Sequence, residues 1–365
     1  MILTCEQMRE SEERLFAGGV AVGPVMEKAG LGLADAVSRT FPEPGRLVAF
    51  VGKGHNGGDA LVAARELAER GWATNILLVP GREGLAELTA EKLVAYEQVR
   101  EARGEVGIVG AWGAARLVLL DGLLGLGATG PLRGMYAEAA AEMNRLRRAE
   151  GGFTVAVDIP TGVDGDDGTV ADGAVTADMT VTMAQVKAGL LAESATNHVG
   201  RIVVVPLDEI EPVGGDESLA LLGERLLRGW LPRRRFDCHK GDAGRVGVVA
   251  GSRGLTGAAD LCSRAAVVSG AGLVTLYAHE SVYEILASRV AAEVMVKPVT
   301  DYRVVMEDRL DAVAIGPGLG LERAEEVLDI VEKDTRPMVV DADALNVVSG
   351  GDVDGILGRC AGARL

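Results

Sequence analysis

The sequence predicts an α/β protein with a doubly wound parallel sheet in its first part and a second α/β unit after it. Short apolar runs rich in β-branched residues alternate with segments of helical periodicity, and most of these runs are continuous rather than interrupted by polar residues. That pattern is typical of parallel strands covered by helices on both faces. The 50 glycines suit many strand-to-helix turns, and 365 residues leave room for roughly two domains.

The first predicted domain covers residues 1–208. Residues 4–40 have a helical pattern, and Gly30 within it is a helix-breaking residue. A further helix is predicted at 60–70, because Gly71 follows where a C-cap is expected. The predicted strands are Leu47–Val51, Asn75–Val79, Leu117–Leu120, Thr154–Val157, Met179–Met183 and Ile202–Val205.

Residues 209–243 are predicted to be a linker, because acids, Pro212 and paired glycines precede a basic cluster at 233–235. We expect one short helix there, Ser218–Leu227, and interpret the basic cluster as a solvated face. The second domain is predicted at 244–365, with strands at 246–250, 273–277, 312–315 and 338–340 and a helix at 258–269.

Composition excludes several classes of partner. The net charge of −16 disfavours nucleic acid and anionic membranes, and an aromatic content of 4% leaves few surfaces for stacking bases. The run 117–132 is apolar but contains Asp121 and repeated glycines, so it is not a membrane span. The amino terminus has no signal-peptide core, and the four cysteines are scattered, which together predict a cytoplasmic protein with idle thiols.

The glycine-rich segment 52–58 joins a predicted strand to a predicted helix. This arrangement offers free backbone N–H groups and a positive helix end to a phosphate. It matches G-x-G-x-x-G, but the second strand runs into Pro80 with no acid at its tip to bind a ribose hydroxyl. The sequence therefore predicts a phosphorylated or nucleotide ligand and disfavours an NAD-dependent dehydrogenase.

Polar residues follow three of the predicted strands. Asp121 and Asp158 come directly after two of them, Asn56 lies in the glycine-rich segment, and Thr161 follows Asp158 closely. Because parallel strands point their carboxyl ends at one crevice, we expect these four side chains to converge. Oxygen ligands of this kind suit a hard cation, although each acid alone also fits a loop or helix cap.

These residues belong to a longer series of motifs: Met8-Arg9, Met26-Glu-Lys-Ala-Gly30, Gly52-Lys-Gly-His-Asn-Gly-Gly-Asp59, Asp121-Gly-Leu-Leu-Gly-Leu-Gly127, Val157-Asp-Ile-Pro-Thr-Gly-Val-Asp164, Ala177-Asp-Met-Thr-Val-Thr182 and Lys187. In this series the chain resembles the bifunctional NAD(P)H-hydrate repair family, in which an NAD(P)HX epimerase is joined to an ADP-dependent NAD(P)HX dehydratase. The resemblance implies a Rossmann-like epimerase domain followed by a ribokinase-like domain. His55 departs from the asparagine usual in the family.

The resemblance also implies roles for residues of the first domain. Asp158 would contact the substrate and is the best catalytic candidate, while Lys187 is a weaker candidate that we interpret as a surface lysine. A potassium ion would be held by Asn56, Asp121 and Thr161. The hydrated nucleotide, NADHX or NADPHX, would be bound by His55, Asn56, Gly57, Gly58, Asp59, Gly125, Leu126, Gly127, Ala128, Thr129, Gly130, Pro131 and Asp158.

The second domain resembles the opening and middle of the dehydratase half. His239-Lys-Gly-Asp242, Thr256-Gly-Ala-Ala259, Ile315-Gly-Pro-Gly-Leu-Gly320 and Val340-Asp-Ala-Asp-Ala-Leu-Asn346 carry this likeness. The resemblance implies a hydrate site at Gly318 and at Ala258 or Ala259, with ADP and Mg²⁺ as cofactors of the complete domain. The family's Gly-Thr-Gly-Asp loop is absent. If Leu365 is the true end, we expect a partial domain without dehydratase activity and with an exposed apolar sheet edge.

Two other functions remain open from the sequence. One is a nucleotide- or lipoprotein-binding scaffold with the epimerase fold, which the intact polar set at residues 56, 121, 158 and 161 disfavours. The other is a small-molecule kinase, which the absent Gly-Thr-Gly-Asp loop disfavours. The sequence leaves the preference for NADHX or NADPHX and homo-oligomer formation undecided.

Overall fold

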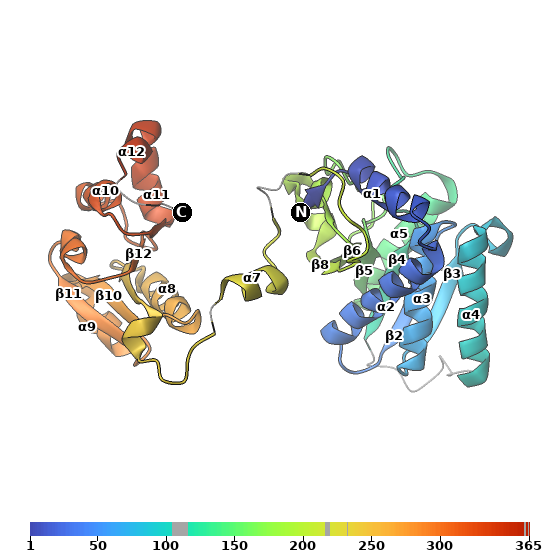
Figure 1. The fold of residues 1–365 in the computed structure, drawn as a ribbon, viewed down its shortest axis with the longest axis horizontal. Coiled ribbons are helices and arrows are strands. Elements are labelled where there is room, and N and C mark those ends of the chain that lie inside the picture. The colour runs from blue at the N-terminus through green and yellow to red at the C-terminus, as the bar shows by residue number, and fades with distance from the viewer. Residues whose placement is uncertain (104–115, 216–219, 232, 361–362, 364) are drawn as a thin grey trace. The chain divides into compact units, whose positions relative to one another are not determined.

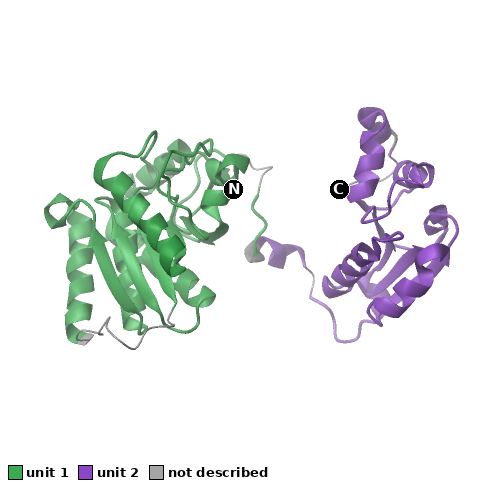
Figure 2. Cartoon of the chain, turned by 180° about the vertical axis from the view of Figure 1, so that it is seen from behind, with its two compact units in different colours: residues 1–224 green, residues 225–365 purple. Residues whose placement is uncertain are grey.

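The computed structural model describes residues 1–103, 116–215, 220–231, 233–360, 363 and 365 (Figure 1). The chain divides into two compact units, Met1–Glu224 and Arg225–Leu365 (Figure 2). This division falls inside the segment 209–243 that the sequence marks as a linker.

Unit 1 is a six-stranded parallel sheet in the order β3-β2-β4-β5-β6-β8. The chain first steps outward from β2 to β3 and then crosses to β4 on the other side, so the direction of winding reverses between β2 and β4. Its elements are β1 (Ile2–Leu3), α1 (Cys5–Ala17), α2 (Val22–Thr40), β2 (Arg46–Val51), α3 (His55–Glu69), β3 (Ala73–Leu78), α4 (Glu87–Arg103), β4 (Leu117–Gly122), α5 (Gly134–Glu150), β5 (Phe153–Val157), β6 (Met179–Met183), β7 (Val186–Lys187), α6 (Thr196–Val199) and β8 (Arg201–Val205), with short 3₁₀ helices at Arg82–Gly84, Ala188–Leu191 and Glu193–Ala195.

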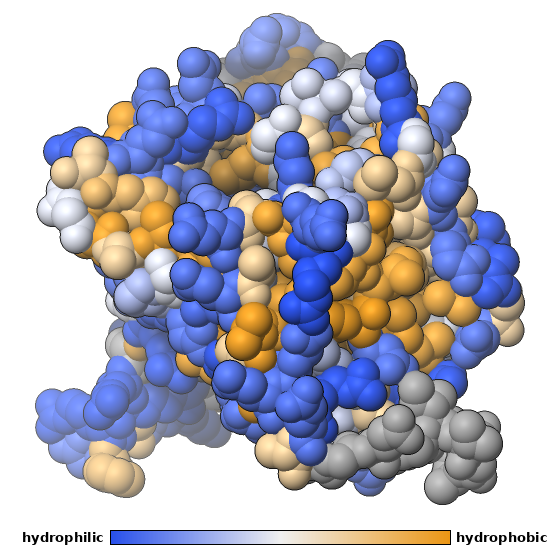
Figure 3. Space-filling view, turned by 90° about the vertical axis from the view of Figure 1, so that its right-hand side faces the viewer, coloured by the Kyte–Doolittle hydropathy of each residue, from blue (hydrophilic) through white to orange (hydrophobic). Residues whose placement is uncertain are grey.

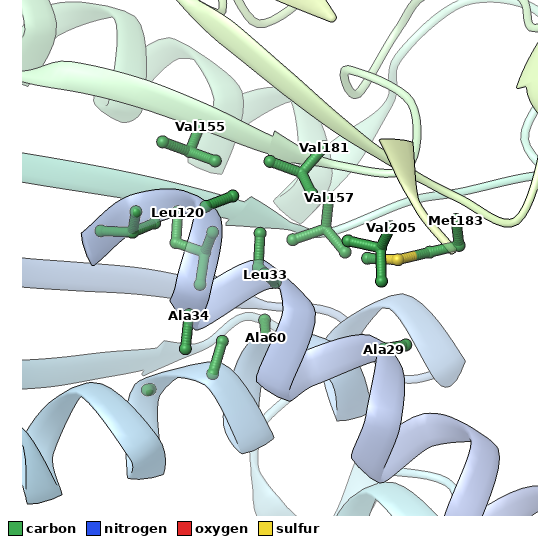
Figure 4. Close-up of a cluster of buried hydrophobic side chains, with 14 of the residues drawn as sticks. Ala29, Leu33, Ala34, Ala60, Leu120, Val155, Val157, Val181, Met183 and Val205 are labelled. Carbon is green, nitrogen blue, oxygen red and sulfur yellow. The ribbon is translucent and has the colours of Figure 1, made fainter. Parts of the chain in front are cut away.

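Helices cover both faces of this sheet, as its apolar strands predict. Leu47, Ala49 and Val51 of β2 belong to the core beneath α2, α3 and α4, whereas Phe50 belongs to the core on the α5 side. Figure 4 shows side chains of α2, among them Leu33, directed toward valines of the neighbouring strands. The outer surface of unit 1 mixes hydrophobic areas with many hydrophilic side chains (Figure 3).

Unit 2 is a five-stranded parallel sheet in the order β11-β10-β9-β12-β13, with its own buried cores. Ala363 and Leu365 hydrogen-bond to the backbone of Met338 and Val340, so backbone pairing continues beyond β13. The elements are α7 (Glu224–Trp230), a 3₁₀ helix (Lys240–Ala243), β9 (Arg245–Val249), α8 (Thr256–Val268), β10 (Leu273–His279), α9 (Glu280–Arg289), β11 (Val294–Val299), a 3₁₀ helix (Tyr302–Glu307), β12 (Ala312–Ile315), α10 (Ala324–Lys333), β13 (Met338–Val340), α11 (Ala342–Ser349) and α12 (Val353–Arg359).

The doubly wound parallel α/β architecture is confirmed, and some local predictions are wrong. The helix expected at 60–70 begins earlier, at His55, and the pattern at 4–40 is two helices separated at residues 18–21. The helix expected at 218–227 is found at Glu224–Trp230, and residues 218 and 219 lie outside the described residues. Strand β11 was not predicted; it contains Pro298 and lies at the sheet edge, where a missing backbone N–H is tolerated.

Candidate functional site in unit 1

A cavity of about 540 Å³ opens at the carboxyl ends of β2 and β4, where the winding of the sheet reverses. The segments that follow these two strands form much of its wall, and α1, α2, α5 and the ends of β5, β6 and β8 also contribute. In doubly wound sheets, ligands bind in the crevice at this reversal point. The fold thus places the candidate site independently of any motif.

The first wall is the amino terminus of α3. The helix begins at His55, with Gly54 as its N-cap, so the glycine-rich loop after β2 is short. A Cβ at Gly57 would lie 2.2 Å from the Gly52 carbonyl oxygen, and one at Gly52 would lie 1.9 Å from that of Leu123. Only glycine allows these three backbone segments to approach so closely. The resulting helix end directs unpaired N–H groups and a partial positive charge toward the cavity.

The second wall is the loop after β4, and Asn56 holds it in place. The amide nitrogen of Asn56 donates to the carbonyl of Leu124 at 2.8 Å and to that of Val157 at 2.9 Å. One side chain therefore links the start of α3 to the ends of β4 and β5. This positions residues 123–128 along the cavity.

Asp121 and Thr161 form a buried pair directly behind this loop. Thr161 donates to Asp121 through its hydroxyl at 2.7 Å and its backbone N–H at 2.8 Å, and Leu123 donates at 3.2 Å. Leu124 connects this pair with Asn56, because its N–H donates to the Thr161 hydroxyl oxygen at 3.2 Å. Burial raises the pKa of Asp121 to about 6, although these hydrogen bonds oppose the shift.

The oxygen-bearing side chains of this cluster are chemically compatible with a hard cation. They offer carboxylate, hydroxyl and amide oxygens around one buried negative charge, the donor set that hard cations prefer. The Asn56 oxygen faces the backbone of Gly125, where a Cβ would lie 3.0 Å away. Among the described residues, no three His, Cys, Asp or Glu side chains gather as a metal site.

Asp158 lies on the cavity wall in an ion pair with Lys187, which is completely buried. The same carboxylate oxygen, Oδ1, accepts from Lys187, from the Thr182 hydroxyl at 3.0 Å and from the Met183 N–H at 3.0 Å. The backbone of Asp158 has a φ of +64°, a conformation uncommon for a residue with a Cβ. The carboxylate is thus anchored through one oxygen, and the residue is held in an unusual backbone conformation at the site.

The structure overturns the interpretation of Lys187 as a surface residue. Lys187 belongs to β7, which pairs in parallel with β1 at the amino terminus of the chain, so residues far apart in sequence enclose it. A buried lysine requires a charged or hydrogen-bonding partner, and Asp158, Thr182 and the Met183 carbonyl supply three.

Two further carboxyl groups, Glu12 and Asp59, line the same cavity. Burial and then the nearby Asp158 charge raise the pKa of Glu12 to about 7, and the same two causes raise the pKa of Asp59 well above its usual range. The sequence analysis missed Glu12, because α1 reaches the cavity only through tertiary packing. Three residues earlier on the helix, Arg9 donates to the Leu126 carbonyl at 3.3 Å, which ties α1 to the loop after β4.

The structure separates the predicted substrate residues into three groups. Those that line the cavity are His55, Asn56, Asp59, Gly125, Leu126, Gly127, Ala128 and Asp158. Thr129, Gly130 and Pro131 line a neighbouring cavity of about 420 Å³, which shares Leu124, Ala128 and Tyr136 with the first. Gly57 and Gly58 are buried and face the protein, since a Cβ at Gly58 would lie 2.5 Å from the Met26 sulfur.

Unit 2 brings its predicted site residues together in the same topological position. The loops after β9 and β12 meet where that sheet reverses, and the Gly251 N–H donates to the Pro317 carbonyl at 2.9 Å. A Cβ at Gly318 would lie 2.9 Å from that of Ala258, whereas Ala259 is buried next to Gly251. The adjacent pair is therefore Ala258 and Gly318.

Comparisons with known proteins follow this division of the chain. Residues 23–189 match the family model of the YjeF-related protein N-terminus, and residues 246–353 match that of NAD(P)H-hydrate dehydratase. A bifunctional NAD(P)H-hydrate repair enzyme from Pyrobaculum aerophilum is 34% identical, covering 89% of this chain and 67% of the relative. That of Gloeobacter violaceus is 35% identical, covering 94% and 70%. The chain belongs to the family of bifunctional NAD(P)H-hydrate repair enzymes.

The chain spans about two thirds of the length of these relatives, 67% for Pyrobaculum aerophilum and 64% for the Escherichia coli enzyme, which is 31% identical. The solved structure of yeast ynu0 is 20% identical with a TM-score of 0.45, covering 60% of this chain and 97% of that one. The ADP/ATP-dependent NAD(P)H-hydrate dehydratase from Bacillus subtilis is 31% identical with a TM-score of 0.31, covering 34% and 46%.

Two structural findings bear on the composition-based expectations. Within the described residues, no helix combines the length and hydrophobicity that a membrane crossing requires. All four cysteines are free thiols, and burial raises the pKa of Cys5 to about 12, which leaves it protonated and unreactive at neutral pH.

Proposed function

We propose that unit 1 interconverts the R and S hydrates of NADH and NADPH. In these substrates the ring carbon C6 carries a hydroxyl group, so epimerisation requires proton transfer to and from oxygen at that carbon. The observation that supports the proposal best is Asp158, a carboxylate on the cavity wall that is anchored through one oxygen by Lys187. Such a group is positioned to exchange a proton with a bound hydroxyl.

The remaining walls suit the rest of a nucleotide. The α3 terminus presents N–H groups for phosphate oxygens, and Lys53 and His55 lie beside it on the cavity wall. Residues 125–128 continue the wall and residues 129–131 border the neighbouring cavity, so we assign both stretches to substrate binding.

We further propose potassium as the ion held by Asn56, Asp121 and Thr161. Bound there, the ion would supply positive charge behind the substrate loop. Asp121 would remain ionised with the ion as its partner, and Asn56 and Thr161 would keep the loop after β4 fixed. The midpoint temperature of thermal unfolding should be higher in potassium chloride than in choline chloride at equal ionic strength. Asp121→Asn should abolish that difference. An equal rise in the variant would exclude this site.

The test of the main proposal compares three forms of the chain. Wild type incubated with the R hydrate should form the S hydrate, followed by chromatography, faster than the spontaneous rate. Asp158→Asn should bind the hydrate with similar affinity and lose turnover, and Asp172→Asn, an exposed residue outside the cavity, should behave as wild type. A wild type that binds the hydrate without interconverting it would favour the alternative function, a binding scaffold.

For unit 2 we propose a contribution to dehydration of the S hydrate through the surface formed by Ala258 and Gly318. The proposed cofactors of that reaction are ADP and Mg²⁺. The observation that favours it is the close approach of these two residues where the sheet reverses. Incubating the chain with the S hydrate, ADP and Mg²⁺ and measuring NADH absorbance tests whether this chain alone performs the reaction.

A further inference from the structure

The cavity of unit 1 contains a carboxyl group that no motif assigned and that α1 supplies. Glu12 lines the cavity together with Asp158, although the two come from different elements, α1 and the end of β5. Glu12 is partly buried, whereas its neighbour Glu13 is exposed. The helix therefore turns one of two consecutive acids toward the proposed site of reaction.

Helix α1 is fixed firmly enough to hold a reacting group. Its amino terminus has a capping box, in which Thr4 accepts from the Gln7 N–H and the Gln7 side chain accepts from the Thr4 N–H. The buried Ser11, next to Glu12, accepts from the Val213 N–H at 2.9 Å. With the bond from Arg9 to the Leu126 carbonyl, these contacts anchor the helix along its length.

We propose that Glu12 is a second catalytic residue of the epimerase, acting as the proton-transfer partner of Asp158 at the C6 hydroxyl. This inference rests on the proposed function. It assigns the two proton transfers of one reaction to two carboxyl groups in contact with the substrate.

The chemistry balances with water alone. The Glu12 proton passes to the C6 hydroxyl, the C6–O bond breaks with loss of water, and the N1 lone pair forms an N1=C6 double bond. Water then adds to C6 from the other face, the double-bond electrons return to N1, and one water proton passes to Asp158. One turnover moves a proton from Glu12 to Asp158, and exchange with solvent restores both groups. The reverse reaction exchanges the two roles.

The charges around Glu12 suit this role. Asp158 and Glu13 raise the pKa of Glu12, while Lys187 and Arg9 lower it, and burial is the largest cause of the net rise to about 7. A group with this pKa both holds and releases a proton at neutral pH. Asp59 also faces the cavity, and burial followed by the Asp158 charge raises its pKa well above the usual range. Asp158 keeps its ion pair with Lys187. In the R-to-S direction, Glu12 is thus the acid and Asp158 is the base.

The test is the pH dependence of R-to-S conversion by the full chain between about pH 5 and 9. Glu12→Gln should lower kcat by about 10²-fold or more and remove the ionisation near pH 7 from the profile, with KM changed little. Glu12→Asp should retain that ionisation at a reduced rate. Glu10→Gln, an exposed change on the same helix, is the matched control and should follow wild type.

Each other outcome has a distinct meaning. Glu12→Gln with kcat within about threefold of wild type and an unchanged profile would overturn the assignment while leaving the proposed function intact. If circular dichroism shows that Glu12→Gln does not fold, Glu12→Asp provides the test instead. A Glu12→Asp variant that reacts at the wild-type rate and whose pH profile lacks the ionisation near pH 7 would overturn the catalytic role of Glu12. A wild type without turnover refutes the epimerase function and this assignment with it.

Discussion

At the scale of single residues, the ion pair between Asp158 and Lys187 is the most consequential contact in unit 1. Both residues are buried, and Lys187 has 0% of its surface exposed. Removing two charges from water is costly, and the cost is recovered only when further hydrogen bonds satisfy both groups, as Thr182 and Met183 do here. The pair fixes the position of the carboxylate that we propose as catalytic more than it adds net stability.

Lys187→Met should therefore lower the free energy of unfolding by about 3–5 kcal/mol, because Asp158 would remain as a buried charge without its partner. Urea denaturation measures the change. The control is Lys28→Met, which removes an exposed ion pair to Glu209 and should cost less than about 1 kcal/mol. Equal losses in the two variants would contradict a special role for burial.

The pKa of Asp59 predicts how stability depends on pH. Burial, followed by the Asp158 and Glu12 charges, raises the pKa of this carboxyl in the folded state above its value in the unfolded chain. The contribution of Asp59 to the free energy of unfolding is complete below about pH 4, the pKa of an aspartate in the unfolded chain. It is lost as the pH rises through the pKa of Asp59 in the folded protein. Asp59→Asn should flatten this decline and increase stability at alkaline pH relative to wild type, measured by urea denaturation. Glu69→Gln, an exposed change on the same helix, should leave the decline intact.

The sequence predicts the convergence of Asn56, Asp121 and Thr161 because each lies at or after the end of a strand, and Leu124 connects them in the structure. Glu12 and the burial of Lys187 could not be predicted in the same way. Both depend on how the amino-terminal segment folds back, α1 over the cavity and β1 against β7. Periodicity identifies the face of a helix that is buried but not the element that it faces.

At the scale of elements, close backbone approach explains why α3 begins at His55 although its first turn contains two glycines. Glycine within a helix costs about 1 kcal/mol relative to alanine, which makes the segment 55–59 look like a loop in sequence. Gly57 and Gly58 are selected instead by their contacts with the Gly52 backbone and with Met26. Tertiary packing has outweighed local propensity.

Gly57→Ala should accordingly destabilise the protein by about 1–3 kcal/mol or more, because the new Cβ would lie 2.2 Å from the backbone oxygen of Gly52 rather than from a flexible side chain. The midpoint of urea unfolding measures this. Gly127→Ala, in the loop opposite, meets nothing within 4 Å and should change stability by less than about 0.5 kcal/mol. A similar loss at both positions would refute the explanation by backbone contact.

At the scale of the whole molecule, two sheets with separate cores were predictable from the sequence, because strand-like runs recur on both sides of a segment with a different composition. The order of the strands was not predictable, since an apolar run does not indicate which other strands pair with it in the sheet. The order decides which strand ends meet, and hence where each candidate site lies.

Limited trypsin treatment should cleave first near Arg233–Arg235, whose side chains are exposed and which precede the first strand of unit 2 in sequence. Mass spectrometry should then detect fragments close to residues 1–235 and 236–365, which persist because each unit retains its own core. First cleavage within the sheet of unit 1 would contradict independent units.

The backbone at Asp158 has an evolutionary consequence. Its φ of +64° falls in a region that asparagine and glycine adopt more readily than most residues. Single-base changes in an aspartate codon produce both, yet either change would leave Lys187 as a buried charge without its carboxylate partner. Relief of the backbone conformation and loss of the ion pair are thus coupled at this one position.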